Sequence, residues 1–185
     1  MNRTHLDLCS SAEWADACRR WIIPWVLDGL DLGADVLELG PGPGRTTEVL
    51  AELVPHLAAA ELDPALAADL AARLPEVEVL EADATDLPHE AGSFSAVLCF
   101  TMLHHLPSRG HQDRLFAQAA RVLRSGGVFA GTDSLDGEDF RQLHVDDICV
   151  PIDPSGLEAR LEAAGLVRVE VAIDDSRVRF RGWRP

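Results

Sequence analysis

The order of apolar and polar positions along the chain predicts strands that alternate with helices. Asp63 and Pro64 form a typical helix start, with the aspartate as N-cap and the proline in the first turn. Short apolar runs typical of buried strands occupy residues 36–39, 58–62, 77–80, 94–100 and 128–132, and helical spacing of apolar residues occupies 46–57, 64–74 and 113–124. This alternation predicts an α/β fold, doubly wound, with a mostly parallel sheet and helices on both faces.

The C-terminal segment has a different pattern. A predicted helix at 155–164 is followed by strict alternation over 167–173, a turn at 174–176 and renewed alternation at 178–180. This pattern predicts a hairpin, which would place an antiparallel strand at the far edge of the sheet. Three arginines share the polar face of the last strand, and we interpret them as a charged face that protects a sheet edge: Arg177, Arg179 and Arg181.

Residues 10–30 predict an N-terminal helix. Ser10 and Glu13 fit a capping box, and Pro24 should kink the helix or split it. Three tryptophans recur at helical spacing, and they would either pack as ordinary core, which we favour, or cover a pocket: Trp14, Trp21 and Trp25. We therefore expect an N-terminal helical cap at 1–33 and one domain at 34–185.

Composition narrows the possible functions. The chain has 185 residues, 47% of them apolar, and 16 basic against 31 acidic residues give a net charge of −15. This charge argues against a nucleic-acid partner, because phosphates would be repelled. The N-terminus lacks an apolar signal segment and no apolar run could span a membrane, so we expect a cytoplasmic protein with no membrane partner. The four cysteines show no paired spacing, so we expect buried thiols rather than a zinc site.

A glycine-rich loop follows the first predicted strand, in VLELGPGPGRTTEVL (residues 36–50). Its glycines, Gly40, Gly42 and Gly44, fit neither GxGxxG nor GxxxxGK, and Pro41 and Pro43 have no N–H to offer. Ligands of open α/β sheets bind outside the carboxyl ends of the strands, where this loop should lie. The loop is poorly suited to a pyrophosphate, and a nucleoside without phosphates fits it better.

Three acidic residues end successive predicted strands beside this loop. Glu38 lies within a buried strand, where a carboxylate needs a partner such as a cationic amine. Glu61 could accept hydrogen bonds from two ribose hydroxyls, and Asp83 could accept one from the amine of adenine. Each acid alone could be a helix cap or a solvated loop residue, but together they indicate a ligand site.

Over residues 34–183 the chain resembles the class I S-adenosylmethionine-dependent methyltransferases that act on small molecules. The resemblance rests on five segments in order, VLELGPGPG, AAELDP, EADATDLP, SFSAVLCFTMLHHL and RVLRSGGVFAGTD. It implies a seven-stranded Rossmann-like sheet with one antiparallel strand, and S-adenosylmethionine as cofactor. Ser95 departs from the family, which usually has aspartate there. The cofactor carries no phosphate, so the prolines remove nothing that it needs.

The resemblance also implies roles for individual residues. Glu38 would hold the methionine amino group, Glu61 the ribose diol, and the pair Asp83 and Ala84 the adenine. The expected cofactor-binding residues are Glu38, Gly40, Pro41, Gly42, Gly44, Thr46, Glu61, Leu62, Asp83, Ala84, Phe100 and Thr101. The acceptor pocket would be formed by the N-terminal helix and by residues 133–153.

Methyl transfer is an in-line displacement, so alignment of donor and acceptor should matter most. Alignment can supply about 7–11 kcal/mol, whereas a general base adds about 10²–10⁴-fold. His105 and His104, just past the fourth strand, are the candidate catalytic bases, with His105 favoured by its position in similar enzymes. Either histidine could instead shape the pocket or cap the next helix. We expect no metal site, because His144 and its acidic neighbours show no recognisable ligand spacing.

These observations predict an enzyme that methylates a small, partly apolar molecule. No large insertion follows the fifth strand, which disfavours a protein or RNA acceptor. A non-catalytic S-adenosylmethionine-binding protein, such as a sensor or interaction module, is the alternative. A dinucleotide-dependent oxidoreductase is disfavoured by the early third glycine and by the prolines.

Overall fold

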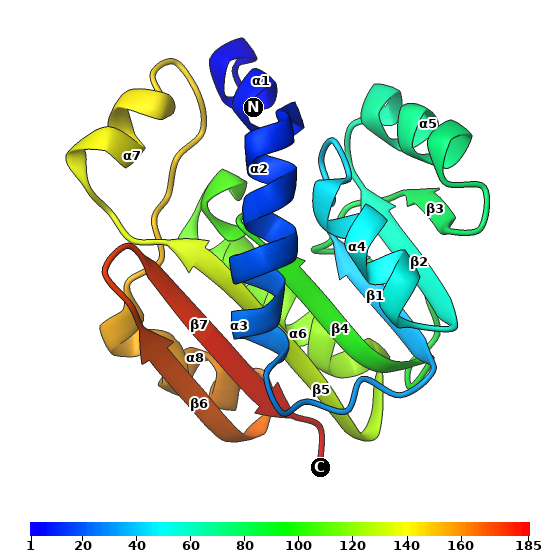
Figure 1. Ribbon diagram of the computed structural model, residues 1–185. Coiled ribbons are helices and arrows are strands. Elements are labelled where there is room, and N and C mark those ends of the chain that lie inside the picture. Colours follow the sequence, from blue (N-terminus) through cyan, green and yellow to red (C-terminus); the bar gives the residue numbers. More distant parts are fainter.

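The computed structural model describes all 185 residues, which are arranged around a seven-stranded sheet (Figure 1). The strands are β1 (Asp35–Leu39), β2 (His56–Glu61), β3 (Glu78–Glu81), β4 (Phe94–Phe100), β5 (Leu123–Ser134), β6 (Val167–Ile173) and β7 (Arg177–Trp183). Their order is β3-β2-β1-β4-β5-β7-β6, and β7 runs antiparallel to both of its neighbours. The predicted fold class is confirmed, although the antiparallel strand lies one place inside the edge, which β6 occupies.

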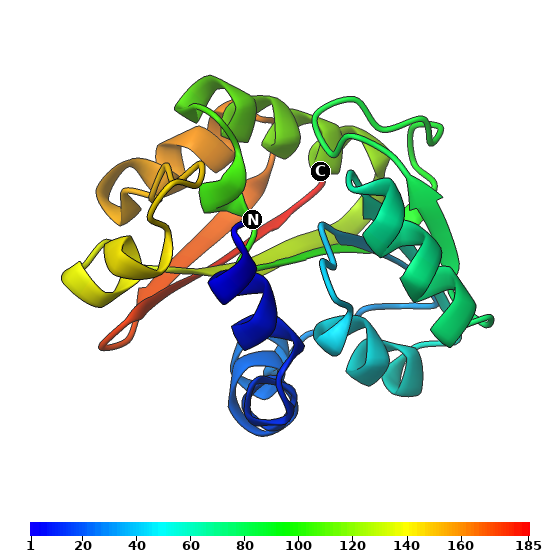
Figure 2. The ribbon, with the colours of Figure 1, turned by 90° about the horizontal axis from the view of Figure 1, so that it is seen from above.

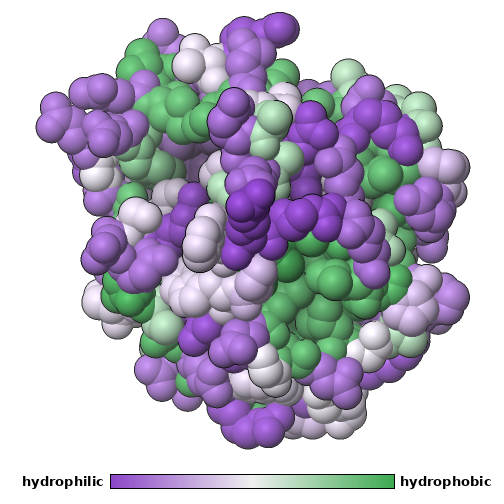
Figure 3. Space-filling view, viewed as in Figure 1, coloured by the Kyte–Doolittle hydropathy of each residue, from purple (hydrophilic) through white to green (hydrophobic).

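Helices cover both faces of the sheet, as the view from above shows (Figure 2). One face packs against the N-terminal helices, α4 (Arg45–Leu53) and α5 (Pro64–Arg73); the other packs against α6 (Arg109–Val122) and α8 (Leu157–Ala163). Successive residues of β1 point to opposite faces, so Val36 joins the first core and Leu37 the second. Glu38 therefore points to the face that α4 covers. Hydrophilic residues spread over much of the surface in Figure 3, and no helix has the length and hydropathy needed to cross a bilayer.

The N-terminal helices form a column that stands against the sheet (Figure 1). The column comprises α1 (Arg3–Ser10), α2 (Ala12–Ala17), a π-helix (Cys18–Ile22) and α3 (Ile23–Leu27). Pro24 has no N–H for the carbonyl four residues back, and the N–H of Ile23 reaches Cys18 in the wider π pattern. The wider turn changes the helical phase, and Trp21 is 71% exposed. The prediction of three tryptophans on one covered face is therefore wrong.

The start of this column also corrects the sequence analysis. Helix α1 was not predicted, and the capping residue of α2 is Ser11, whose Oγ accepts the N–H of Trp14 at 3.1 Å. Ser10 instead donates to the carbonyl of Leu6, so the predicted capping box is wrong. The column packs into the core of the main sheet through Cys18, Ile22 and Val26. The division of the chain at residue 33 stays a prediction.

Prolines and caps explain most of the shifted boundaries. Helix α4 ends at Leu53, earlier than predicted, because Val54 precedes Pro55 and adopts extended angles. Helix α6 begins at Arg109, earlier than predicted, because Ser108 caps it by accepting the N–H of His111. Strand β4 has the predicted bounds, and Asp63 caps α5 as predicted.

The arginines of β7 hold the N-terminal column in place. Arg179 donates to the carbonyl of Trp25 at 2.8 Å, and Arg181 donates to those of Val26 at 2.8 Å and Asp28 at 2.7 Å. These carbonyls belong to the last turn of α3 and the residue after it, where helical partners are lacking. The interpretation of these arginines as edge protection is wrong, because β7 lies between β5 and β6 and Arg181 is buried.

Candidate functional site

A cavity of about 550 Å³ opens at the carboxyl ends of β1, β2 and β4. Its volume falls within the range of small-molecule sites, and more than half of its lining residues are hydrophobic. Its walls come from the glycine loop, the ends of β2 and β4, the N-terminal column and the segment after α7 (Glu138–Leu143). The predicted site residues that line it are Gly40, Pro41, Gly42, Thr46, Glu61, Leu62, Asp83, Ala84, Phe100, Thr101 and His105.

Each glycine of the loop has a positive φ, and each glycine N–H already has a partner within the protein. The N–H of Gly40 donates to the carbonyl of Ala60 at 2.9 Å, and that of Gly44 donates to the carbonyl of Pro41 at 3.0 Å. The N–H of Gly42 donates to Oε2 of Glu61 at 2.8 Å. The loop from residue 40 to 44 therefore has no free N–H for a phosphate, since Pro41 and Pro43 have none.

Glu38 is a buried carboxylate with one oxygen satisfied. It is 1% exposed and lies behind Thr46, whose hydroxyl donates to its Oε1. Its Oε2 is buried without a partner. Burial raises the pKa of Glu38 to about 7, although the nearby hydroxyls of Thr46 and Thr47 lower it. A buried carboxylate of this kind can be stabilised by a cation placed beside Thr46.

Glu61 and Asp83 occupy the rim where predicted, but Glu61 already holds the loop. Its Oε1 accepts the N–H of Asp63 at 2.9 Å, in addition to the bond from Gly42. A carboxylate has about four acceptor positions, so Glu61 can still accept from a ligand. Asp83 is exposed and uses Oδ1 for the N–H of Thr85. Leu62 lines the cavity and is 66% exposed, which suits contact with a flat apolar ring.

Three predicted residues lie behind the cavity wall: Glu38, Gly44 and His104. Gly44 has φ +82°, and a β-carbon there would lie 2.3 Å from Cδ1 of Leu70. Gly44 thus permits the close packing of α4 on α5 rather than contact with a ligand. On the wall itself, Thr101 has φ +50°, an uncommon value for a residue other than glycine.

Histidines occupy the other end of the cavity. His105 lines it, and burial, with the neighbouring His104 and His5, lowers the pKa of His105 to about 3. His104 is fully buried, and its Nδ1 lies 2.6 Å from Oδ1 of Asp133. Burial alone would raise the pKa of Asp133, but His104 and two backbone N–H groups hold it below the usual value. Because an ionised carboxylate only accepts, Nδ1 of His104 carries the proton.

The N-terminus closes this end of the cavity by binding the segment after α7. The backbone N–H of Asn2 donates to Oδ2 of Asp147 at 2.8 Å, and its side-chain amide donates to the carbonyls of Leu143 at 2.7 Å and Val145 at 3.1 Å. The sequence analysis missed three residues before the predicted helix that line the cavity here: Met1, Leu6 and Cys9. It predicted that the N-terminal helix and residues 133–153 form the acceptor pocket, and Trp14, Asp147 and Ile148 from those segments line the cavity.

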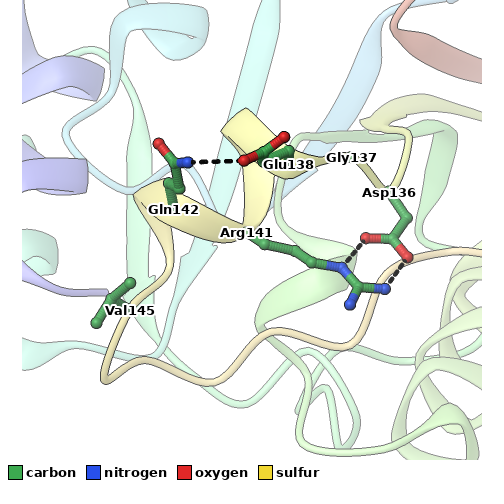
Figure 4. Close-up of a pocket in the computed structure, with 6 residues that line it drawn as sticks. All are labelled: Asp136, Gly137, Glu138, Arg141, Gln142 and Val145. Carbon is green, nitrogen blue, oxygen red and sulfur yellow. Dashed lines mark hydrogen bonds and ion pairs between the residues drawn. The ribbon is translucent and has the colours of Figure 1, made fainter.

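A second hollow lies against α7 (Figure 4), but its charged groups satisfy one another. Arg141 donates to both oxygens of Asp136, at 2.6 and 2.5 Å, and Gln142 donates to Glu138 at 3.4 Å. No side chain there has a buried polar atom without a partner. The cavity at the strand ends is therefore the candidate site.

Comparisons with known proteins indicate a family for the chain. Residues 37–131, about half of the chain, match the family described as "Methyltransferase domain". A probable S-adenosylmethionine-dependent methyltransferase of Mycolicibacterium smegmatis is 33% identical over 97 residues, which are 52% of this chain and 37% of that protein. The chain thus spans little more than a third of the length of this relative.

Two solved structures share the fold. A SAM-dependent methyltransferase from Aquifex aeolicus covers 98% of each chain with a TM-score of 0.76 and 16% identity. Phosphoethanolamine N-methyltransferase 2 of Haemonchus contortus, in complex with S-adenosyl-L-methionine, has a TM-score of 0.75 and 15% identity, over 95% of this chain and 53% of that one. At these identities the likeness shows the fold alone.

Proposed function

Because the chain belongs to the class I S-adenosylmethionine-dependent methyltransferase family, we propose that it transfers a methyl group from that cofactor to a small-molecule acceptor. The membership confirms the resemblance of the five segments to S-adenosylmethionine-dependent methyltransferases, and the small-molecule acceptor is part of the proposal. The observation that carries the proposal is that a loop without free N–H groups follows a strand whose Glu38 has an unpartnered Oε2. Such a site favours an unphosphorylated, cationic nucleoside.

The residues around the cavity suit S-adenosylmethionine from end to end. Glu38 would bind the amino group, and Glu61, already fixed by Gly42 and Asp63, would accept from the ribose hydroxyls. Asp83 and Leu62 would hold the adenine by a hydrogen bond and by apolar contact. The sulfonium of the bound cofactor supplies an electrophilic methyl group.

The acceptor would occupy the end of the cavity beneath the N-terminal column. Its wall there is largely apolar, from Leu6, Cys9, Trp14, Leu106 and Ile148, which favours a partly apolar molecule. Contacts of this wall would hold the acceptor in line with the methyl group, and alignment of this kind can lower a barrier by about 7–11 kcal/mol. Alignment is thus the main catalytic contribution in this proposal.

His105 and His104 have a smaller part in the proposed mechanism. A general base works best when its pKa is near the working pH, and burial holds the pKa of His105 at about 3. His105 is therefore neutral and able to accept a proton, but weakly basic. His104 lies behind it, with Nδ1 committed to Asp133.

Calorimetry with S-adenosylmethionine, S-adenosylhomocysteine and NAD tests the binding step. We expect both adenosyl compounds to bind and NAD not to bind; binding of NAD alone would favour an oxidoreductase. Catalysis is tested by incubating the protein and labelled S-adenosylmethionine with a metabolite extract and isolating labelled products. Binding without any labelled product would support a non-catalytic binding protein instead.

A further inference from the structure

Four histidine side chains from separate parts of the chain meet beside the cavity. They are His5 on α1, His104 and His105 after β4, and His144 just after α7. One ring nitrogen from each lies within 4.8 Å of those from the other three, and the ring centres are 4.2–5.9 Å apart. Three of the four side chains are buried, and His105 is half-buried.

The cluster leaves buried nitrogens on every ring without a partner. These are Nδ1 of His5, Nε2 of His104, both nitrogens of His105 and Nε2 of His144. A buried polar atom without a hydrogen bond is costly, and five of them in one place are unusual. A neutral imidazole has one nitrogen with a lone pair, so each of the four rings can offer one nitrogen to a metal ion.

Two rings are oriented as metal-binding histidines usually are. Nδ1 of His144 lies 2.6 Å from the carbonyl oxygen of Phe140, which can only accept, so this nitrogen carries the proton. His104 donates from Nδ1 to Asp133 in the same manner. A bond from one ring nitrogen to a carboxylate or a carbonyl fixes the tautomer and leaves Nε2 free for a metal. Both free Nε2 atoms belong to the unpartnered set.

We propose that His5, His104, His105 and His144 bind one divalent transition-metal ion in a closed, four-imidazole site. Imidazole suits Zn²⁺, Cu²⁺, Fe²⁺ and Ni²⁺, and a tetrahedral zinc site has Zn–N distances of about 2.0–2.1 Å. Ligand nitrogens around such an ion are about 3.4 Å apart, which small side-chain rotations reach from the present spacing. Asp133 and Asp147, next to the cluster, offset the added charge.

The ion would join α1 and the segment after α7 to the end of β4, and so fix the wall of the acceptor end of the cavity. The four ligands come from three separate segments, so their distances along the chain gave no recognisable metal motif. This inference goes beyond the proposed function and does not depend on it. It also assigns His104 and His105 to a metal rather than to proton transfer.

The test is a titration of the chelator-treated full chain with Co²⁺, followed by competition with Zn²⁺. We expect one Co²⁺ per chain with the intense visible bands of four-coordinate nitrogen ligation, and a higher melting temperature with Zn²⁺. His5→Gln and His144→Gln should each bind at least tenfold more weakly. His56→Gln, which changes an exposed histidine outside the cluster, should bind as the natural protein does.

Three results would overturn the proposal. The first is an absence of stoichiometric binding by the natural protein. The second is equal binding by His5→Gln, His144→Gln and His56→Gln. The third is strong near-ultraviolet thiolate bands, which would assign the ion to cysteines. If circular dichroism shows that one variant is unfolded, the other variant and the Co²⁺ spectrum of the natural protein decide the question.

Discussion

The two ends of the cavity are built in opposite ways. At the glycine-loop end, every glycine N–H donates a hydrogen bond to the loop itself or to the end of β2. One carboxylate oxygen, Oε2 of Glu38, remains without a partner there. At the histidine end, the wall comes from segments more than a hundred residues apart, and ring nitrogens remain without partners. The first end is preformed by local hydrogen bonds, whereas the second depends on long-range contacts. Substitutions at the two ends should therefore have different consequences.

The largest effect is expected from Glu38→Gln. Loss of a hydrogen bond between charged groups costs about 1.5–3 kcal/mol, so affinity for S-adenosylmethionine should fall roughly 10- to 100-fold in calorimetry. Glu52→Gln, at an exposed residue paired with Arg19, is the control and should bind normally. Unchanged affinity in Glu38→Gln would remove the main support for a cationic ligand.

Glu38→Gln should also abolish the pH dependence that Glu38 gives to the free energy of unfolding and to cofactor affinity. Folding raises the pKa of Glu38 from 4.5 to about 7, so the folded chain binds more protons than the unfolded chain between those values. The contribution of Glu38 to the free energy of unfolding therefore falls as pH rises from about 4.5 to 7, by about 3 kcal/mol in total. Conversely, affinity for the cationic cofactor should rise over pH 6–8. Denaturation and calorimetry at several pH values should show both changes in the natural protein and neither change in Glu38→Gln.

Gly42→Ala should weaken binding more than folding. A β-carbon at Gly42 meets only Cε of Met1, at 3.7 Å, so the added methyl group would stand at the cavity wall. We expect affinity for S-adenosylmethionine to fall by about 1–2 kcal/mol through overpacking. Gly29→Ala, with a similar positive φ and open space around it, should show the same backbone strain without the loss of affinity. Equal affinities for the two variants would show that Gly42 does not contact the cofactor.

Asn2→Ala should loosen the histidine end. Asn2 caps α1 by accepting the N–H of His5, and loss of such a cap costs about 0.5–2 kcal/mol. We expect faster limited proteolysis within residues 1–30, and slower proteolysis of the natural protein once S-adenosylmethionine is added. Asn2→Ser retains a capping oxygen but cannot reach Leu143 and Val145, so it separates the cap from the closure of the cavity. Cofactor-independent proteolysis would contradict the closure of this end over the ligand.

The smallest effect on the chemical step is expected from His105→Gln. With a pKa of about 3, His105 should contribute less than tenfold to kcat, well below the 10²–10⁴-fold of an efficient base. Single-turnover rates with a known acceptor would measure this contribution. A loss above a hundredfold with unchanged metal content would restore His105 as the base.

The sequence predicted the glycine-loop end better than the histidine end. The apolar run at 94–100 predicted β4, and the Asp63 cap predicted the start of α5. The short-range pattern also predicted the glycine loop after the first strand and the three acidic residues at the strand ends. Thr46 was also predicted, although its bond to Glu38 was not. These features depend on residues that are close in sequence or that end neighbouring parallel strands.

The remaining features depend on tertiary contacts. Helix α1 has a polar sequence, and only its packing shows that His5 and Cys9 are buried. The arginines of β7 were interpreted as protection of a sheet edge, because no local pattern indicates that Arg181 donates to the carbonyls of Val26 and Asp28. The π-helix turned Trp21 outward, a change of phase that regular helical spacing does not predict.

The internal hydrogen bonds of the glycine loop have a consequence for selectivity among adenine compounds. ATP and other nucleoside triphosphates are abundant competitors for any adenosine pocket. A triphosphate that approached this loop would find no free N–H between residues 40 and 44 and would face the carboxylate of Glu61, in a chain with a net charge of −15. We therefore expect the backbone of this loop to disfavour triphosphates relative to an unphosphorylated adenosine derivative.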